Sequence, residues 1–88
     1  MAAYRVEVAG GGRRDLQRLA PSVLERVYRV LIALGDDPRP AGSEKLIGLD
    51  AYRIRVGDYR AIYEVDDRAR LVTVSRVRHR REVYRKLR

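Results

Sequence analysis

AYRIRVGDYRAIYEVD, residues 51–66, is the stretch that decides the fold of this chain. Two runs of alternating apolar and polar residues, 51–56 and 59–66, flank the dipeptide Gly57-Asp58. A two-residue connection of this composition is typical of a tight β-hairpin turn. Because side chains alternate between the faces of a strand, the turn also sets the register. The predicted pairs are Val56–Tyr59, Arg55–Arg60 and Arg53–Ile62.

This register divides the hairpin residues between two faces. The apolar face, predicted to lie on the core, holds Tyr52, Ile54, Val56, Tyr59, Ala61, Tyr63 and Val65. The other face holds Arg53, Arg55, Arg60, Ile62 and Glu64. Like charges directly opposite each other destabilise a sheet unless solvent or a bound anion screens them. We interpret the three arginines as an anion-binding surface. The alternative is an ordinary solvated face, on which the arginine stems cover apolar surface.

The sequence on either side extends the hairpin into a small mixed domain. Alternation predicts a strand, and apolar residues at steps of three and four predict amphipathic helices. The expected elements are a strand at 4–8, a break at 10–12, helices at 13–20 and 22–34, a loop at 36–44, a strand at 70–77 and a short helix at 79–87. We therefore expect one α+β domain over residues 1–88, in the order β-α-α-β-β-β-α. A helix pair should pack on one face of a twisted, mainly antiparallel sheet.

The composition excludes several classes of protein. The absence of cysteine excludes a disulfide framework, a thiol nucleophile and an iron–sulfur cluster. A single histidine, His79, excludes a histidine-rich metal site. No apolar run approaches the ~20 residues of a membrane span, and the N-terminus does not resemble a signal peptide. We therefore expect a soluble, cytoplasmic domain with no metal site.

Positive charge is concentrated at the C-terminus. The chain has 20 Lys and Arg against 12 Asp and Glu, a net charge of +8. Residues 76–88 hold seven basic residues and one acidic residue, so six of the eight charges lie there. Most of the basic residues are arginines, whose guanidinium groups bind phosphate through two parallel hydrogen bonds. This pattern predicts a polyanionic partner such as a nucleic acid. The alternative is a solvated tail whose arginines reflect codon usage.

The predicted C-terminal helix carries further candidate site residues. Arg80 and Tyr84 lie four residues apart and therefore share a helix face. The phenol ring of Tyr84 would stack on an unpaired base while Arg80 binds phosphate. Alternatively, Tyr84 is a core residue. His79 is a candidate for proton transfer or phosphate contact, or it has a structural role.

Three segments together resemble the RelE branch of the RelE/ParE toxin superfamily. They are Lys45-Leu46-x-Gly48, YRIRVGDYRAIYE at 52–64 and VRHRREVY at 77–84. The resemblance spans the chain in element order. It implies a toxin of a type II toxin–antitoxin pair that cleaves mRNA in the A site of the 30S ribosomal subunit, without metal or cofactor. Attack of a ribose 2′-OH on the adjacent phosphate would give a 2′,3′-cyclic phosphate. The implied partners are ribosome-bound mRNA and a cognate acidic antitoxin, with no membrane association.

The resemblance also implies roles for individual positions. Arg60 would bind the phosphate, and Arg80 would stabilise the transition state or the leaving group. Tyr84 would stack on the substrate nucleotide or deprotonate it. The predicted RNA-binding residues are Arg53, Arg55, His79 and Arg81.

One departure from the family pattern concerns the general base. Some members have lysine at the positions of Arg53 and Arg55, and lysine can act as a base, whereas arginine does not give up its proton. The remaining candidates are Tyr84, His79 and Glu64, unless the ribosome orients the 2′-OH so well that no strong base is needed. Two other functions stay open. One is a ParE-like poison of DNA gyrase on the same fold, and the other is a catalytically weak relative that binds nucleic acid.

Overall fold

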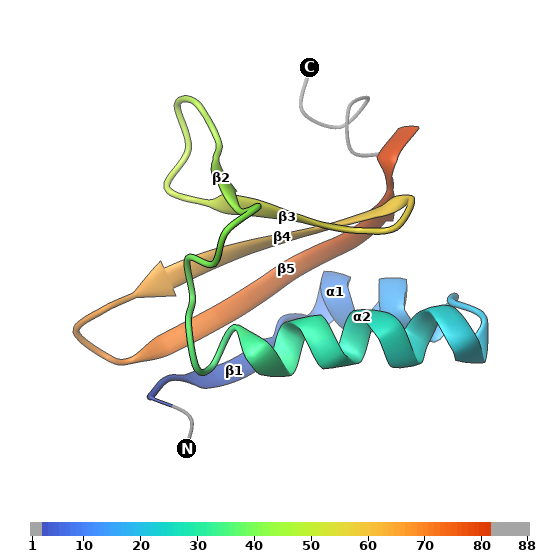
Figure 1. The fold of residues 1–88 in the computed structure, drawn as a ribbon, viewed down its shortest axis with the longest axis horizontal. Coiled ribbons are helices and arrows are strands. Elements are labelled where there is room, and N and C mark those ends of the chain that lie inside the picture. Colours follow the sequence, from blue (N-terminus) through green and yellow to red (C-terminus); the bar gives the residue numbers. More distant parts are fainter. Residues whose placement is uncertain (1–2, 82–88) are drawn as a thin grey trace.

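The computed structural model describes residues 3–81, which form a five-stranded sheet with two helices on one side (Figure 1). The strands are β1 (Arg5–Val8), β2 (Glu44–Lys45), β3 (Tyr52–Val56), β4 (Tyr59–Asp66) and β5 (Leu71–His79). The helices are α1 (Gly10–Gln17) and α2 (Pro21–Ala33). The sheet order is β1-β5-β4-β3-β2; β1 is parallel to β5 and the other pairs are antiparallel. The predicted α+β fold class is confirmed, with one strand, β2, in addition to the four that were predicted.

The central hairpin has the predicted register. Its pairs include Val56–Tyr59, Arg55–Arg60 and Arg53–Ile62. Gly57 has a φ of 59°, a left-handed conformation that glycine adopts without steric cost. The Gly57-Asp58 turn therefore fixes which side chains face the helices and which face away.

A bulge between β4 and β5 keeps the last strand in phase with the core. Ile62 pairs with Arg76 but Tyr63 pairs with Val74, so Ser75 is left as an extra residue. The Ser75 hydroxyl donates a hydrogen bond to the carbonyl of Ile62 at 3.2 Å. Since the bulge absorbs one residue, Val74 and Val77 are both buried, and the positions of Arg76 and Arg78 fall on the face that the helices leave open.

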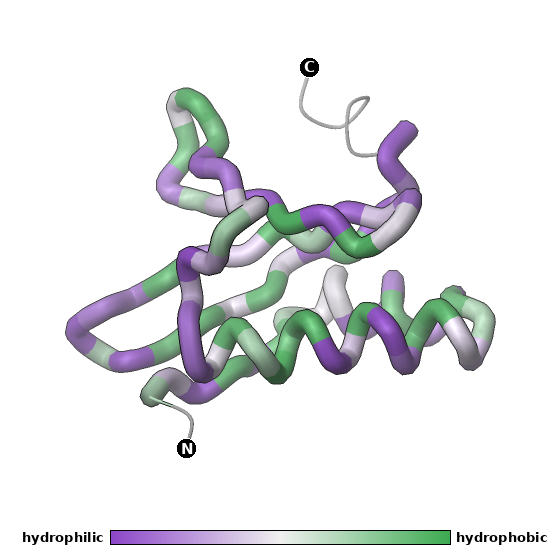
Figure 2. The backbone as a smooth tube through the Cα atoms, in the orientation of Figure 1, coloured by the Kyte–Doolittle hydropathy of each residue, from purple (hydrophilic) through white to green (hydrophobic). Residues whose placement is uncertain are grey.

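The core lies between the sheet and α2. Hydrophobic residues recur along α2 at intervals of about one turn (Figure 2). The buried members of the cluster are Val27, Leu31, Leu34, Ile54, Val56, Ala61, Tyr63, Val72, Val74 and Val77. The helices therefore cover one face of the sheet. We call the opposite face, which carries Arg53, Arg55 and Arg60, the open face.

Helix α1 begins at Gly10, three residues earlier than predicted, and ends at Gln17. Gly10–Gly12, which were expected to separate the first strand from the first helix, form the first turn of α1. A Cβ atom on Gly12 would lie 2.9 Å from the carbonyl oxygen of Val74, so only glycine allows α1 to approach β5 this closely. Helix α2 begins with Pro21 in its first turn, where proline is well suited. Within residues 3–81, neither helix is long and apolar enough to cross a membrane.

Strand β5 also differs from the prediction at both ends. Arg70 has a φ of 53° and belongs to the preceding turn, so the strand begins at Leu71. His79 was predicted to open the C-terminal helix, but it pairs with Tyr59 as the last residue of β5. The chain becomes helical at Arg80, whose backbone N–H donates to the carbonyl of Asp58 at 2.8 Å. Most of the predicted helix lies outside the described residues.

Candidate functional site

A groove of about 350 Å³ lies on the open face of the central hairpin. It is lined by Gly42, Glu44, Arg53, Arg55 and Arg60, and we call it the arginine groove. Its arginines come from β3 and β4, while Gly42 and Glu44 belong to the segment that leads into β2 and to β2 itself. Three of the predicted site residues are thus brought together in one concave surface.

Arg60 is the most enclosed residue of the arginine groove. It was predicted to lie on an anion-binding face, with a solvated face as the alternative, and only 5% of it is exposed. Its Nη1 donates hydrogen bonds to the carbonyl oxygens of Tyr59 at 3.0 Å and Gly57 at 3.3 Å. These bonds hold the guanidinium at Nη1, and no buried side-chain nitrogen or oxygen among the described residues is left without a partner. The group is therefore a fixed cation that opens onto the groove.

Glu44 supplies a carboxylate to the same groove. It pairs with Arg53 in the β2–β3 ladder, and its Oε2 lies 3.2 Å from Nη2 of Arg53. The Arg53 side chain is 18% exposed and that of Glu44 is 66% exposed, so the carboxylate faces solvent and incoming ligands. The sequence placed Glu44 in a loop without a role, because a two-residue strand leaves no detectable alternation.

A second carboxylate, Asp15, holds two further arginines of the open face. Asp15 lies on α1 and is only 5% exposed. It accepts hydrogen bonds from the backbone N–H of Val77 at 2.9 Å and from Nε of Arg78 at 3.1 Å, and it lies 3.3 Å from Nε of Arg76. Arg78 pairs with Arg60 across the β4–β5 ladder, but its guanidinium bonds to Asp15 instead of lining the arginine groove. Asp15 is 63 residues from Arg78, and no sequence pattern indicated this contact.

His79 lies apart from the arginine groove. It lines a smaller cleft of about 170 Å³ together with Asp15, Arg18, Leu19, Tyr59, Val77 and Arg78. Its ring packs edge-to-face on Tyr59 at 5.5 Å, and its Nδ1 accepts a 3.4 Å hydrogen bond from the backbone of Arg81. His79 is therefore held by neighbouring groups on the side of β5 that faces the helices.

The other predicted site residues lie around the margin of this region or outside it. Arg80 and Arg81 are exposed just after β5, next to the hairpin turn at Asp58. Glu64 lines a separate depression with Asp66, Asp67 and Thr73. Tyr84 lies outside the described residues.

The arginine groove offers the guanidinium groups of three arginines and the carboxylate of Glu44 to a ligand. Guanidinium groups donate paired hydrogen bonds to phosphate oxygens, and a carboxylate accepts a proton. In the part of the chain from residue 3 to residue 81, no three His, Asp or Glu side chains come together in a way that would hold a metal ion. The groove is therefore suited to binding a phosphodiester and moving a proton beside it.

Comparison with known proteins gives two sequence matches. A family model described as the ParE toxin of the type II toxin-antitoxin system, parDE, matches residues 7–84. Toxin RelG of Mycobacterium tuberculosis (strain ATCC 25618 / H37Rv) is 36% identical over an alignment 89 residues long. The alignment covers 94% of this chain and 98% of that protein.

Solved structures give matches of similar extent. The RelBE2 toxin-antitoxin complex from Mycobacterium tuberculosis matches with a TM-score of 0.80 and 30% identity, over 88% of this chain and 98% of the matched chain. The archaeal RelE-RelB complex from Pyrococcus horikoshii OT3 matches with a TM-score of 0.76 and 28% identity, over 89% and 96% of the two chains. The intact E. coli RelBE complex matches with a TM-score of 0.77 and 26% identity, over 88% and 96%.

Proposed function

This chain belongs to the family of ParE toxins of type II toxin-antitoxin systems, in the RelE-like branch of the RelE/ParE superfamily, and we propose that it is a ribosome-dependent endoribonuclease. The proposed substrate is mRNA in the ribosomal A site, cleaved without a metal ion. The observation that carries the proposal is the arginine groove, which Arg53, Arg55 and Arg60 line together with the carboxylate of Glu44.

The arginines would act on the scissile phosphate. Attack on a phosphodiester develops a second negative charge on the phosphorane, and preorganised donors stabilise that charge more than they stabilise the ground state. Arg60 meets this requirement because two backbone carbonyls already hold it. Arg55, directly opposite on β3, would bind the same phosphate, and Arg80 would stabilise the oxygen that leaves.

Glu44 is our candidate for the general base. Its carboxylate would take the proton of the ribose 2′-OH as the 2′ oxygen forms a bond to phosphorus. The bond between phosphorus and the 5′ oxygen then breaks, the 5′ oxygen keeps the electron pair and takes a proton from water, and a 2′,3′-cyclic phosphate is left. The ion pair with Arg53 orients the carboxylate. Glu44 thus supplies the base that the arginines at positions 53 and 55 cannot provide.

Two of the remaining predicted residues, Tyr84 and Arg81, would bind the RNA beside the cut. Tyr84 keeps the role that the family resemblance implies, stacking on the substrate base. Arg81 would contact the RNA backbone beside Arg80. His79 packs against Tyr59 in its own cleft, so we assign it no contact with the scissile phosphate.

A cognate antitoxin is the second proposed partner. Three matched structures are toxin-antitoxin or RelE-RelB complexes. The exposed positive charge of the open face would attract an acidic segment that becomes ordered on binding.

A translation extract tests the proposed function directly. The chain is added to the extract and the 5′ ends of the message are mapped. New ends within codons held in the A site, absent with an Arg60→Ala variant, are the expected result. An intact message would overturn the proposal.

The alternative is inhibition of DNA gyrase by a ParE-like toxin; the matched family model is described as the ParE toxin of type II systems. A parallel assay of gyrase supercoiling with the same protein distinguishes the two functions. Loss of supercoiling with an intact message would support the ParE-like function. No effect in either assay would leave the third function, that of a catalytically weak relative that binds nucleic acid.

A further inference from the structure

We infer that Arg39, on the opposite side of the sheet edge from the arginine groove, is a positioning residue that sets the place of Glu44. The segment between α2 and β2 runs from the helix side of the sheet around β3 to the open face (Figure 1). Arg39 fixes the first half of this segment, and Glu44 stands at its end. The expected effect of Arg39 on RNA cleavage rests on the proposed function, whereas its expected effect on the position of Glu44 does not.

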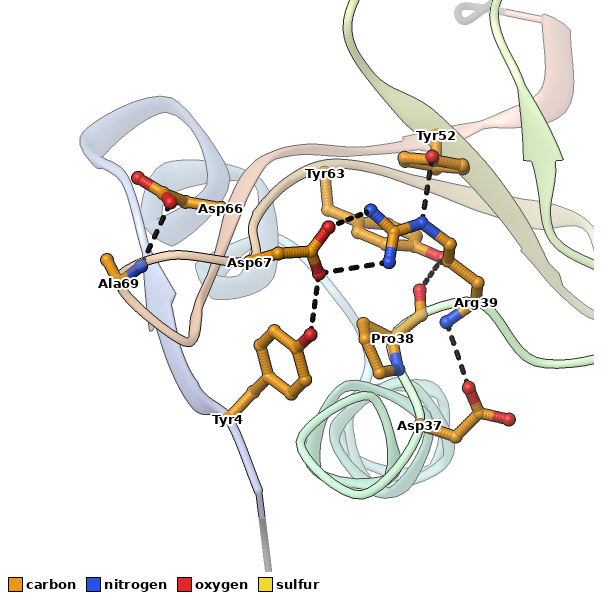
Figure 3. A network of polar contacts seen from close by, with 9 residues as sticks. All are labelled: Tyr4, Asp37, Pro38, Arg39, Tyr52, Tyr63, Asp66, Asp67 and Ala69. Atoms are coloured by element: carbon orange, nitrogen blue, oxygen red, sulfur yellow. Dashed lines mark hydrogen bonds and ion pairs between the residues drawn. The ribbon is translucent and has the colours of Figure 1, made fainter.

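Arg39 joins three parts of the chain (Figure 3). Its Nη1 and Nη2 form a two-pronged contact with Asp67 in the β4–β5 turn, at 3.1 and 3.0 Å. Its Nε donates a 2.9 Å hydrogen bond to the hydroxyl of Tyr52 on β3. Because all three donor atoms of the guanidinium are engaged, the contact fixes both the position and the orientation of the residue.

Neighbouring groups reinforce this network. The hydroxyl of Tyr4 donates to Asp67 at 2.6 Å, and the hydroxyl of buried Tyr63 donates to the carbonyl of Pro38 at 2.7 Å. Hydrogen bonds from Arg39 and Tyr4 hold the pKa of Asp67 below its ordinary value. Tyr52 stacks on Tyr63 at 5.7 Å, which ties the network to the core.

The chain between Arg39 and Glu44 has little freedom to absorb a displacement. Prolines at 38 and 40 restrict the backbone on both sides of Arg39. The backbone N–H and the hydroxyl of Ser43 both donate to the carbonyl of Pro40, at 3.0 and 2.8 Å, and close a turn. Gly42, within this turn, has a φ of 95° and lines the arginine groove. A shift at Arg39 is therefore transmitted to Glu44.

Strand β2 gives Glu44 only a short backbone pairing. It contains two residues and pairs only with β3, at Arg53 and Tyr52. Such a short edge pairing contributes little stability without a second anchor. The backbone N–H of Leu46 donates to the carbonyl of Ala51 at 2.9 Å and anchors the chain after β2. The Arg39 network anchors the chain before β2 and, through Tyr52, reaches the residue next to Arg53 on the same strand.

An NMR experiment on the isolated protein tests the structural consequence. The Nη2–Hη signal of Arg53 reports its ion pair with Glu44, because Nη2 is the donor of that contact. The Glu44→Gln variant gives the reference signal for a broken pair. We expect Arg39→Ala to move the signal most of the way to that reference. Arg39→Lys keeps the charge but loses the two-pronged contact with Asp67, so it should move the signal partly. Arg29→Ala removes an exposed arginine from an ion pair with Glu25 on α2 and serves as the matched control, with no shift expected. An Arg53 signal that stays at its wild-type position in both Arg39 variants would overturn the inference.

A cleavage experiment tests the catalytic consequence. Arg39→Ala should slow cleavage on programmed ribosomes by about tenfold or more in the wild-type background, because small misplacements of reacting groups are costly. In a Glu44→Gln background the same substitution should change the rate less than about twofold, since the group that it positions is already lost. Equal losses in both backgrounds would indicate general structural damage and contradict the positioning role. If the wild type does not cleave, the proposed function fails, and the NMR result still decides the place of Glu44.

Discussion

Arg55 and Arg60 lie directly opposite each other on β3 and β4, yet Arg55 is exposed and Arg60 is buried. The two guanidinium groups thus meet different surroundings. Two backbone carbonyls accept hydrogen bonds from Arg60, and Glu44 at the neighbouring strand adds negative charge to the same groove. These groups offset part of the repulsion that opposed like charges would otherwise cause. The pair combines a fixed donor with an exposed one.

Arg60→Ala should lower the single-turnover cleavage rate by about 10²–10³-fold, as the loss of a preorganised transition-state donor does. Arg55→Ala should have a smaller effect, since Arg55 is exposed and less strictly held. The rates are measured on ribosomes programmed with a defined A-site codon. Thermal unfolding of both variants controls for loss of fold. Near-wild-type cleavage by a folded Arg60→Ala variant would remove Arg60 from the site.

Glu44→Gln should lower the cleavage rate by about 10²-fold or more, because general bases contribute at least that much. Glu64→Gln is the matched control, since Glu64 lies on β4 outside the arginine groove. If Glu44 serves only as a counter-ion to Arg53, the Gln variant should instead bind RNA more tightly and cleave at least as fast.

Asp15→Ala should reduce the free energy of unfolding by about 3 kcal/mol, because it removes the buried acceptor that the N–H of Val77 shares with two guanidinium groups. The change is measured by urea denaturation. Glu25→Ala is the comparison: it breaks an exposed ion pair with Arg29 and should cost less than about 0.5 kcal/mol. Equal effects of the two substitutions would mean that Asp15 does not anchor α1 to β5.

The Tyr4–Asp67 contact should make stability depend on pH at both ends of the scale. The pKa of Asp67 is lowered in the folded protein, chiefly by its hydrogen bond from Arg39. Its contribution to stability is therefore complete above the ordinary aspartate pKa and is lost as the pH falls through the lower folded value. Hydrogen bonding to Asp67 raises the pKa of Tyr4, so that contribution is complete below the ordinary tyrosine value and is lost as the pH rises through the folded one.

Asp67→Asn should flatten the acid arm of this profile. Urea midpoints of the wild type and the variant, measured from about pH 6 to about pH 2, should converge as the wild-type carboxylate becomes protonated. Parallel losses of stability in the two proteins would show that Asp67 does not contribute to the acid arm.

The hairpin and its register could be predicted because a two-residue turn leaves one pairing for the strands that flank it. That pairing by itself places Arg53, Arg55 and Arg60 on one face. The burial of Arg60 could not be predicted in the same way. It depends on the carbonyls of the turn and on the walls of the groove, and these come from β2 and the preceding segment.

Contacts between distant parts of the chain account for the other differences. In the sequence, Gly10–Gly12 resembles a break between two elements. Only the close approach of α1 to β5 explains why these residues are helical. Asp15 meets Arg78 across 63 positions without any local pattern. Glu44 reaches the groove through a two-residue strand that is too short to show alternation.

The most direct test of the account is cleavage of a message in which a single A-site nucleotide, the one 5′ to the cut, carries 2′-deoxyribose. The account predicts that the ribosome-bound all-ribose message is cut to give a 2′,3′-cyclic phosphate and a 5′-OH, and that the deoxy-substituted message stays intact at that position. Cleavage of the deoxy-substituted message at the wild-type rate, or products with a 3′-OH and a 5′-phosphate, would contradict attack by the 2′-OH in the arginine groove.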